Sequence, residues 1–355
     1  MSHPALIIDT RKLEHNTHVI ARLLDEQGMR LVGVAKGTCA NLSVVEAMVS
    51  GGARAIGDSR IGNLRRIRQW GYEGETILLR SPGPSQCEEA VHYADTSLNS
   101  EIEIVRRLGE AARKAGKAHQ VILMIELGDL REGVLVDKAP EVAFKMAQVP
   151  GVELVGIGAN MACYGGVIPT RGKMNTLLEA RKEIEQRLGR PLLRVSGGTS
   201  ANMNLVLNQE IPPGITELRI GEGILLGKEA VKRNPIDGCF QDAFTLQAEV
   251  IEVQDKPSKP MGEIGQDAFG KVPVFRDRGI RARAILAAGR QDVDPSDLRP
   301  LTKGVEILGA SSDHLICDIE DANDSIYVGK ILSFNISYGT LLRASTSPYV
   351  CKEVV

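Results

Sequence analysis

The sequence has no long apolar run, no large excess of either charge and no paired cysteines. No stretch in its 355 residues reaches the roughly 18 to 20 consecutive apolar residues that span a bilayer. The first nine residues lack the basic region and apolar core of a signal peptide, so we expect a cytoplasmic location. The formal net charge of −2 argues against nucleic acid or a membrane surface as a partner, because both attract basic surfaces.

Patterns for metal sites and disulfides are missing as well. The six cysteines contain no CxxC pair, which argues against a disulfide framework or a zinc site. The six histidines show no ligand spacing, so we expect no metal. The length allows two domains, or one large barrel with a smaller domain beside it.

Apolar strand candidates alternate with helical segments through the first two thirds of the chain. The candidates are Val32–Lys36, Arg54–Asp58, Thr76–Arg80, Asp95–Asn99, Val121–Glu126, Leu154–Asn160, Leu192–Gly198 and Glu217–Gly221. Eight strands separated by helices over about 200 residues are typical of an α/β fold of the parallel (β/α)₈ TIM-barrel type, whereas an open doubly wound sheet rarely needs eight such even units. We expect residues 1–235 to form this barrel, and an earlier strand at residues 6–9 is a candidate member of the second domain.

The pattern changes after Pro235. Long strand-like runs separated by Gly, Pro and Asp clusters replace the alternation, with no convincing helix between them. We therefore expect residues 236–355 to form a C-terminal all-β domain.

Chemistry in a (β/α)₈ barrel takes place at the carboxyl ends of its strands. A polar or glycine-rich group closes every expected strand: Lys36, Asp58-Ser59, Arg80, Asn99, Glu126, Asn160, Ser196-Gly197-Gly198 and Arg219-Ile220-Gly221. A single polar strand end is common, but a full series of them indicates a functional mouth.

Two glycine-rich strand ends predict a phosphate site. Ser196, Thr199 and Ser200 supply hydroxyl groups where a helix opens after the seventh strand, and Gly221-Glu222-Gly223 follows the eighth. Barrels commonly bind phosphate at these two loops. With Lys36 on the first strand, the arrangement suggests a phosphorylated aldehyde held as a Schiff base, which is pyridoxal phosphate.

These motifs resemble the alanine racemase-like, fold-type III group of pyridoxal-phosphate enzymes, and the ornithine racemase branch most closely. Val34-Ala35-Lys36 is similar to the group's cofactor-lysine strand, and residues 217–221 to its Arg-x-Gly element. Residues 127–133 resemble its strand-five loop. In the β domain, residues 312–314 and 335–339 are similar to two segments that reach the mouth.

The resemblance implies a role for each matched residue. Lys36 would hold the pyridoxal phosphate, Arg219 would face its pyridine nitrogen, and Asn160 stands where alanine racemase stacks a histidine on the ring. Arg131 would help to recognise the substrate carboxylate. The phosphate would be bound by Ser200, Tyr338 and the backbone N–H groups of Gly221 and Glu222.

The resemblance also implies a homodimer, because Ser312, Asp313 and His314 would reach the mouth from a second subunit. The family tyrosine that serves as the opposite-face base has no counterpart, and Ile264 aligns with it. We weigh Asp267 and His314 equally as substitutes, with Cys163 and Tyr338 as further candidates.

The expected activity is racemisation of an amino acid, most closely ornithine or another basic one. A basic side chain would need a carboxylate at the mouth, and the candidates are Glu126, Asp129, Glu222 and Asp313. Three alternatives remain open at this point: a fold-type III decarboxylase, a non-catalytic pyridoxal-phosphate-binding protein, and, less favoured, a cofactor-free two-cysteine racemase.

Overall fold

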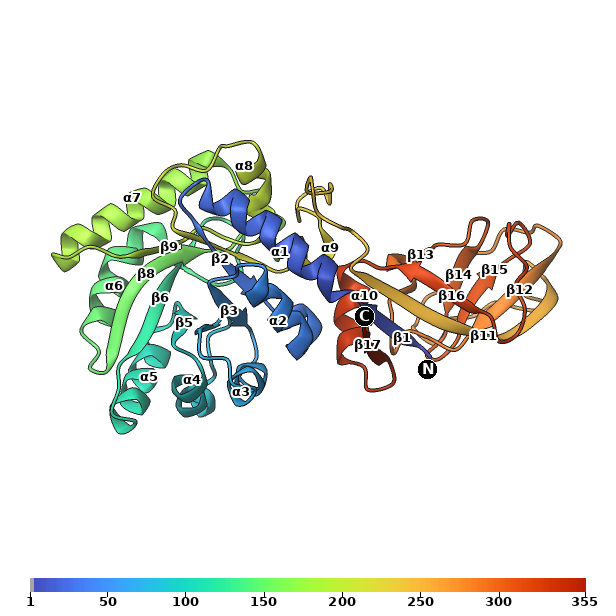
Figure 1. Cartoon of the computed structure of the whole chain (residues 1–355), viewed down its shortest axis with the longest axis horizontal. Helices are drawn as coiled ribbons and strands as arrows, with labels where there is room; N and C mark the ends of the chain where they lie inside the picture. Colours follow the sequence, from blue (N-terminus) through green and yellow to red (C-terminus); the bar gives the residue numbers. More distant parts are fainter. Residues whose placement is uncertain (1–2) are drawn as a thin grey trace. The chain divides into compact units, whose positions relative to one another are not determined.

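The computed structural model describes residues 3–355, which divide into two compact units (Figure 1). One unit comprises residues 10–241, and the other combines residues 242–355 with the chain's start up to Asp9. None of the described helices is both long enough and apolar enough to cross a membrane.

The larger unit is a closed parallel barrel, as predicted. Around the barrel the strands are β2 (Arg30–Val34), β3 (Ala55–Asp58), β4 (Glu75–Leu78), β5 (Thr96–Asn99), β6 (His119–Glu126), β8 (Val152–Ala159), β9 (Arg194–Ser196) and β10 (Glu217–Ile220). The ring closes because β5 pairs with β6 and β10 pairs with β2. A short strand, β7 (Val134–Leu135), pairs with the carboxyl end of β6.

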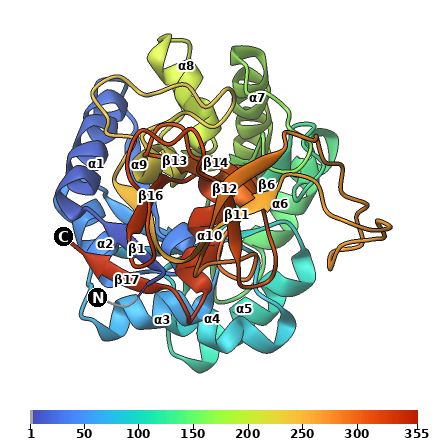
Figure 2. The same ribbon diagram turned by 90° about the vertical axis from the view of Figure 1, so that its right-hand side faces the viewer.

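Helices ring the barrel (Figure 2). They are α1 (Thr10–Asp25), α2 (Leu42–Ser50), α3 (Ile61–Gln69), α4 (Cys87–Tyr93), α5 (Ile102–Lys114), α6 (Ala139–Ala147), α7 (Arg171–Leu188), α8 (Met203–Leu207) and α9 (Glu222–Leu226). Helix α5 shows why they form: Val105, Leu108 and Ala112 recur three or four residues apart and are buried on one face. Single 3₁₀ turns are η1 (Lys36–Thr38), η2 (Pro84–Gln86), η3 (Val136–Lys138) and η4 (Ser200–Asn202).

Charged side chains close the amino end of the barrel. Glu217, with no exposed side-chain surface, pairs with Arg30 at 2.7 Å and Arg194 at 3.0 Å. Glu75 pairs with the same two arginines at 2.7 Å each. Burial alone would raise the pKa of Glu217, but the two arginines outweigh it and lower that pKa. All four residues are the first in their strands, so the network ties β2, β4, β9 and β10 together away from the expected mouth.

The smaller unit is built on an antiparallel sheet in the order β13-β16-β11-β12-β15-β14. These strands are β11 (Phe244–Pro257), β12 (Ile280–Leu286), β13 (Arg299–Pro300), β14 (Glu306–Ala310), β15 (Leu315–Asp318) and β16 (Ile331–Asn335). The chain's first strand, β1 (Ala5–Ile8), belongs to this sheet: it pairs antiparallel with β11 and parallel with β17 (Cys351–Val354).

One helix in this unit was not expected from the sequence. Helix α10 (Tyr338–Thr346) follows β16, and a 3₁₀ turn, η5 (Pro295–Asp297), lies in an earlier loop. The helical pattern is weak because the buried apolar residues are only Leu341 and Ala344, and Thr340 and Ser345 are polar residues on the buried side. Tertiary packing stabilises a helix that periodicity alone does not predict.

We expect Glu217→Gln to destabilise the barrel by about 3 to 5 kcal/mol, because it leaves two arginines facing a buried neutral group. Urea denaturation followed by circular dichroism measures the loss. Glu89→Gln is the matched control, since Glu89 forms a half-exposed pair with Arg65 at 3.4 Å whose removal should cost less than about 1 kcal/mol. Equal effects of the two variants would contradict a structural role for the buried network.

Candidate active site

Lys36 lies at the carboxyl rim of the barrel, just beyond β2. The expected strand included Lys36, but β2 ends at Val34 and Lys36 opens η1. The backbone N–H of Ala35 donates to the carbonyl of Gly57 at 3.0 Å, which continues the parallel register with β3. The side chain is accessible to solvent, yet the pKa of Lys36 is lowered, first by desolvation and next by the charge of Arg131. A larger fraction of this amine is therefore neutral near pH 7 than in a free lysine.

The turn after Lys36 holds an unusual backbone conformation. Cys39 and Ala40 have positive φ values of 53° and 48°, which non-glycine residues rarely adopt. The guanidinium of Arg66 donates to the carbonyl of Cys39 at 2.7 Å, and Asn41 caps α2 by accepting the N–H of Ser43 at 3.1 Å. These bonds fix the segment that carries the lysine.

Arg219 places a buried positive charge on β10, the strand that pairs with β2. It is 3% exposed. Its guanidinium donates to the carbonyl of Ala159 at 2.7 Å, to Oδ1 of Asn160 at 2.6 Å, and to the hydroxyl and carbonyl of Ser196. Burial lowers the pKa of Arg219 to about 10, so the group is still protonated near pH 7.

Ser200 lies where the two glycine-rich strand ends meet. Its buried Oγ accepts the backbone N–H groups of Gly221 at 3.3 Å and Gly223 at 3.1 Å. A hydroxyl can accept these bonds and still donate its own hydrogen, and a hydroxyl beside backbone N–H donors suits the oxygen atoms of a phosphate. The carboxylate of Glu222 forms an ion pair with Arg233.

Asp129 is not available to bind a basic substrate side chain. It is buried, and its carboxylate accepts the backbone N–H groups of Cys163 at 3.2 Å, Tyr164 at 2.9 Å and Val167 at 3.2 Å. Burial raises the pKa of Asp129, but these hydrogen bonds together lower it. The carboxylate therefore fixes the loop after β8 to the loop after β6.

Cys163 does not meet the requirement for a thiolate base. That alternative needed a depressed pKa, whereas burial raises the pKa of the Cys163 thiol. The thiol lies 3.2 Å from the carbonyl of Met161 and remains protonated near pH 7.

Asp58 is a buried carboxylate next to Lys36 in the register of β2 and β3. Asp58 has no exposed surface. Its carboxylate accepts the backbone N–H of Arg60 at 2.8 Å, and both of its oxygens lie 3.1 Å from Nδ2 of Asn63. Burial raises the pKa of Asp58 to about 6, although these bonds oppose the increase. The sequence predicts Asp58 as a strand end but does not reveal Asn63 as its partner, because only the fold brings the two together.

Several predicted site residues lie in the smaller unit. Asp267 is exposed in a loop, and its carboxylate accepts the N–H groups of Phe269 and Lys271 at 2.9 Å each; the same bonds lower its pKa. His314 follows β14 and its Nδ1 lies 3.4 Å from Oγ of Ser311. Ser312 donates to Asp313 at 2.6 Å, and Tyr338 opens α10.

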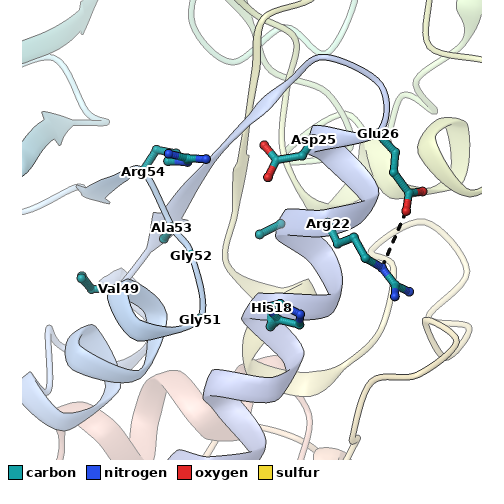
Figure 3. Close-up of a pocket in the computed structure, with 10 residues that line it drawn as sticks. His18, Arg22, Asp25, Glu26, Val49, Gly51, Gly52, Ala53 and Arg54 are labelled. Atoms are coloured by element: carbon teal, nitrogen blue, oxygen red, sulfur yellow. Dashed lines mark ion pairs between the residues drawn. The ribbon is translucent and has the colours of Figure 1, made fainter.

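The larger unit also contains a separate cavity of about 460 Å³, and Figure 3 shows residues that line it. It is lined by the end of α1 and by the loop that precedes β3, and it contains His18 and Arg54. In Figure 3, Arg22 pairs with Glu26 at 3.7 Å along α1. Because these segments lead into the amino ends of strands, this cavity is not the predicted mouth.

The comparisons with known proteins agree with this architecture. The sequence pattern of the alanine racemase N-terminal domain matches residues 8–228. The chain is 42% identical over 354 residues to an ornithine racemase of Acetoanaerobium sticklandii, which covers 99% of this chain and 100% of the relative. It is 42% identical over 352 residues to a lysine racemase of Thermotoga maritima, with 99% and 98% covered.

Solved structures share the fold. An alanine racemase from Corynebacterium glutamicum superposes with a TM-score of 0.76 at 18% identity and covers all of both chains. A D-threonine aldolase from Filomicrobium marinum gives a TM-score of 0.75 at 18% identity, covering 97% of this chain and 89% of that one. Both solved structures thus share this chain's architecture, a (β/α)₈ barrel with a second β unit. The chain belongs to the alanine racemase family, which confirms the resemblance seen in its motifs.

We expect Asp58→Asn to change how stability depends on pH. With a pKa of about 6 in the folded protein against an ordinary 3.8, Asp58 binds its proton more tightly when folded. The stabilisation of the folded protein by protonated Asp58 is therefore complete below about pH 4 and is lost as the pH rises through 6. The free energy of unfolding changes by about 3 kcal/mol over this range.

The variant should thus gain stability relative to the wild type between pH 4 and pH 7. Urea midpoints of the two proteins, measured without cofactor across this range, give the difference. Asp137→Asn, at an exposed position, is the control. A difference that stays constant with pH would contradict the elevated pKa.

Proposed function

We propose that this protein is a pyridoxal 5'-phosphate-dependent amino-acid racemase that acts on ornithine or another basic amino acid. The observation that carries the proposal is the placement of two cationic side chains on paired strands of one barrel. Lys36 lies just beyond β2, and Arg219 lies within β10. An accessible amine of lowered pKa on the strand paired with that of a buried guanidinium suits a carbonyl cofactor. The names of the two full-length relatives support a basic substrate.

The donors at the rim fit pyridoxal phosphate. Lys36 would hold the aldehyde carbon, and Arg219 would face the pyridine nitrogen, with Asn160 and Ser196 fixing its guanidinium. Ser200 and the N–H group of Glu222 would bind the phosphate, with the N–H of Gly221 exchanging its long bond to Ser200 for a phosphate oxygen, and Tyr338 would also contribute. When bound, the cofactor supplies an electron sink that stabilises the carbanion formed by loss of the α-proton.

The protein's own groups would then position the substrate and move its proton. Once the amine of the substrate has replaced it at the aldehyde carbon, the freed Lys36 amine, neutral in larger fraction than an ordinary lysine, would take the α-proton from one face and return it there in the reverse direction. The guanidinium of Arg131 would bind the α-carboxylate, a pairing that suits its planar shape. Arg219 does not give up its proton readily near pH 7, so it would leave the pyridine nitrogen unprotonated.

Inversion needs a second proton carrier on the opposite face, and we assign it to Asp267 or His314 of a neighbouring subunit in a homodimer. Ser312 and Asp313 would complete the substrate site from the same subunit. The backbone donors that lower the pKa of Asp267 keep it ionised, so it would accept a proton only weakly. The cytoplasmic location stays a prediction from the sequence.

We expect exchange of the α-proton with solvent to depend on Lys36. Purified protein with pyridoxal phosphate in heavy water should exchange the α-proton of both enantiomers of ornithine or lysine, with inversion. Lys36→Ala should slow this exchange at least about 1,000-fold, because the base on one face is lost. Proton NMR and chiral chromatography provide the two measurements.

Lys117→Ala, a lysine variant outside the rim, controls for general effects of losing a lysine. Exchange without inversion would indicate that only one face carries a base. Absence of exchange across a panel of amino acids would reject racemisation of those substrates.

We further expect two inactive variants to complement each other if the site is shared. Lys36→Ala disables the barrel, and the double variant Asp267→Asn/His314→Gln disables the contribution of the β unit. Subunit exchange in an equal mixture makes half of the dimers mixed, and each of these has one intact site, so about a quarter of wild-type activity should return. Full activity of the double variant alone would show that neither residue carries the second proton.

A further inference from the structure

A continuous chain of hydrogen bonds joins the buried Arg219 to Arg131 at the mouth. Arg219 donates to Oδ1 of Asn160 at 2.6 Å, and Nδ2 of Asn160 donates to the carboxylate of Glu132. Arg131 donates to the same carboxylate through Nε and through Nη2, the latter at 2.6 Å. The loop after β6, the end of β8 and strand β10 are therefore linked through side chains.

The chemistry of these groups fixes which of them donates and which accepts along this series of hydrogen bonds. A guanidinium can only donate, so the amide oxygen of Asn160 must face Arg219. Its NH₂ group then faces Glu132, which as a carboxylate can only accept. Asn160 is 7% exposed and Arg219 is 3% exposed, so the barrel holds these two inner members of the hydrogen-bonded series rigidly.

Glu132 connects these fixed side chains to Arg131, whose side chain is accessible to solvent. The side chains of Arg131 and Glu132 are 36% and 33% exposed, and neighbouring charges at such a surface ordinarily contribute little. Here, however, Oε1 of Glu132 also accepts the amide of the buried Asn160. The carboxylate is therefore anchored, and its two-point pairing orients the plane of the Arg131 guanidinium.

This pairing leaves one edge of Arg131 open. Glu132 occupies the edge formed by Nε and Nη2, and in the described part of the chain no hydrogen bond engages Nη1. The edge formed by Nη1 and Nη2 can thus bind a second carboxylate in the same planar manner. Hydrogen bonding to Glu132 also raises the pKa of Arg131, which keeps it charged among the cations of the rim.

We propose that Glu132 is a positioning residue that orients Arg131 to bind the α-carboxylate of the amino acid. This inference rests on the proposed function and extends it to a residue that the sequence motifs did not single out. Glu132 does not touch the substrate; it acts by holding the guanidinium in place between Asn160 and the ligand.

The test separates carboxylate recognition from general disruption. In the protein loaded with pyridoxal phosphate, Glu132→Gln should raise KM for ornithine about 10- to 100-fold, the range expected on losing a charge-assisted pair. The change in kcat should be smaller than about 5-fold. Absorbance titrations should show weaker binding of ornithine in the variant, but unchanged binding of 1,4-diaminobutane, which is ornithine without its carboxylate.

Two controls accompany the variant. Glu153→Gln makes the same change at an exposed position near the amino end of β8 and should behave as the wild type. In an Arg131→Lys background, Glu132→Gln should add less than about 3-fold to KM, because the two residues act as one unit. Equal weakening of ornithine and 1,4-diaminobutane, or an unchanged KM in Glu132→Gln, would overturn the inference.

The two proposals fail in different ways. If the wild type binds ornithine more tightly than the diamine but never inverts it, racemisation is wrong, and loss of that preference in Glu132→Gln would still support the positioning role. If the wild type inverts ornithine and the preference survives in Glu132→Gln, the proposed function stands and the role of Glu132 is wrong.

Discussion

The buried guanidinium of Arg219 is the interaction on which the organisation of the rim depends. A charge with 3% exposure is costly unless its donors are satisfied, and here the acceptors are carbonyl, hydroxyl and amide oxygens supplied by β8 and β9. The hydrogen bonds donated by Arg219 fix the side chains of Ser196 and Asn160, and Asn160 in turn orients Glu132. One buried cation therefore dictates side-chain positions on three neighbouring segments before any ligand is present.

The barrel separates stability from chemistry along its axis. At the amino end, Glu75 and Glu217 alternate with Arg30 and Arg194, so every charge has two opposite neighbours and the network is closed. At the carboxyl end, the pKa of Lys36 is lowered and that of Asp58 is raised because their environment leaves them incompletely compensated. At the amino end the pairing favours the charged forms, as the lowered pKa of Glu217 shows, whereas Lys36 and Asp58 are shifted toward their neutral forms, which is typical of functional sites.

The sequence predicted the fold well because its periodicity is local information. The bounds of all eight barrel strands agree with the predicted ranges to within a few residues. Lys36 was singled out as a candidate because it follows an apolar run. Helix α10 was not predicted because its apolar pattern is short. The short strands β13 and β17 were not predicted either, because their stability comes from pairing with strands elsewhere in the chain. The partners Asn63 and Glu132 were missed for a related reason: nothing in their own neighbourhood shows that they meet Asp58 or Asn160.

The acidic residues at the rim are engaged by partners that the sequence does not reveal. Counting carboxylates in the sequence offered Asp129 and Glu222 as binders of a basic side chain, but backbone N–H groups occupy the first and Arg233 the second. A carboxylate that is already satisfied gains little by exchanging its partners for a ligand. Glu132 differs because its partner, Arg131, keeps a free edge directed away from the pair. Negative charge at this rim therefore orients a cation, and the cation is the group that can meet the substrate.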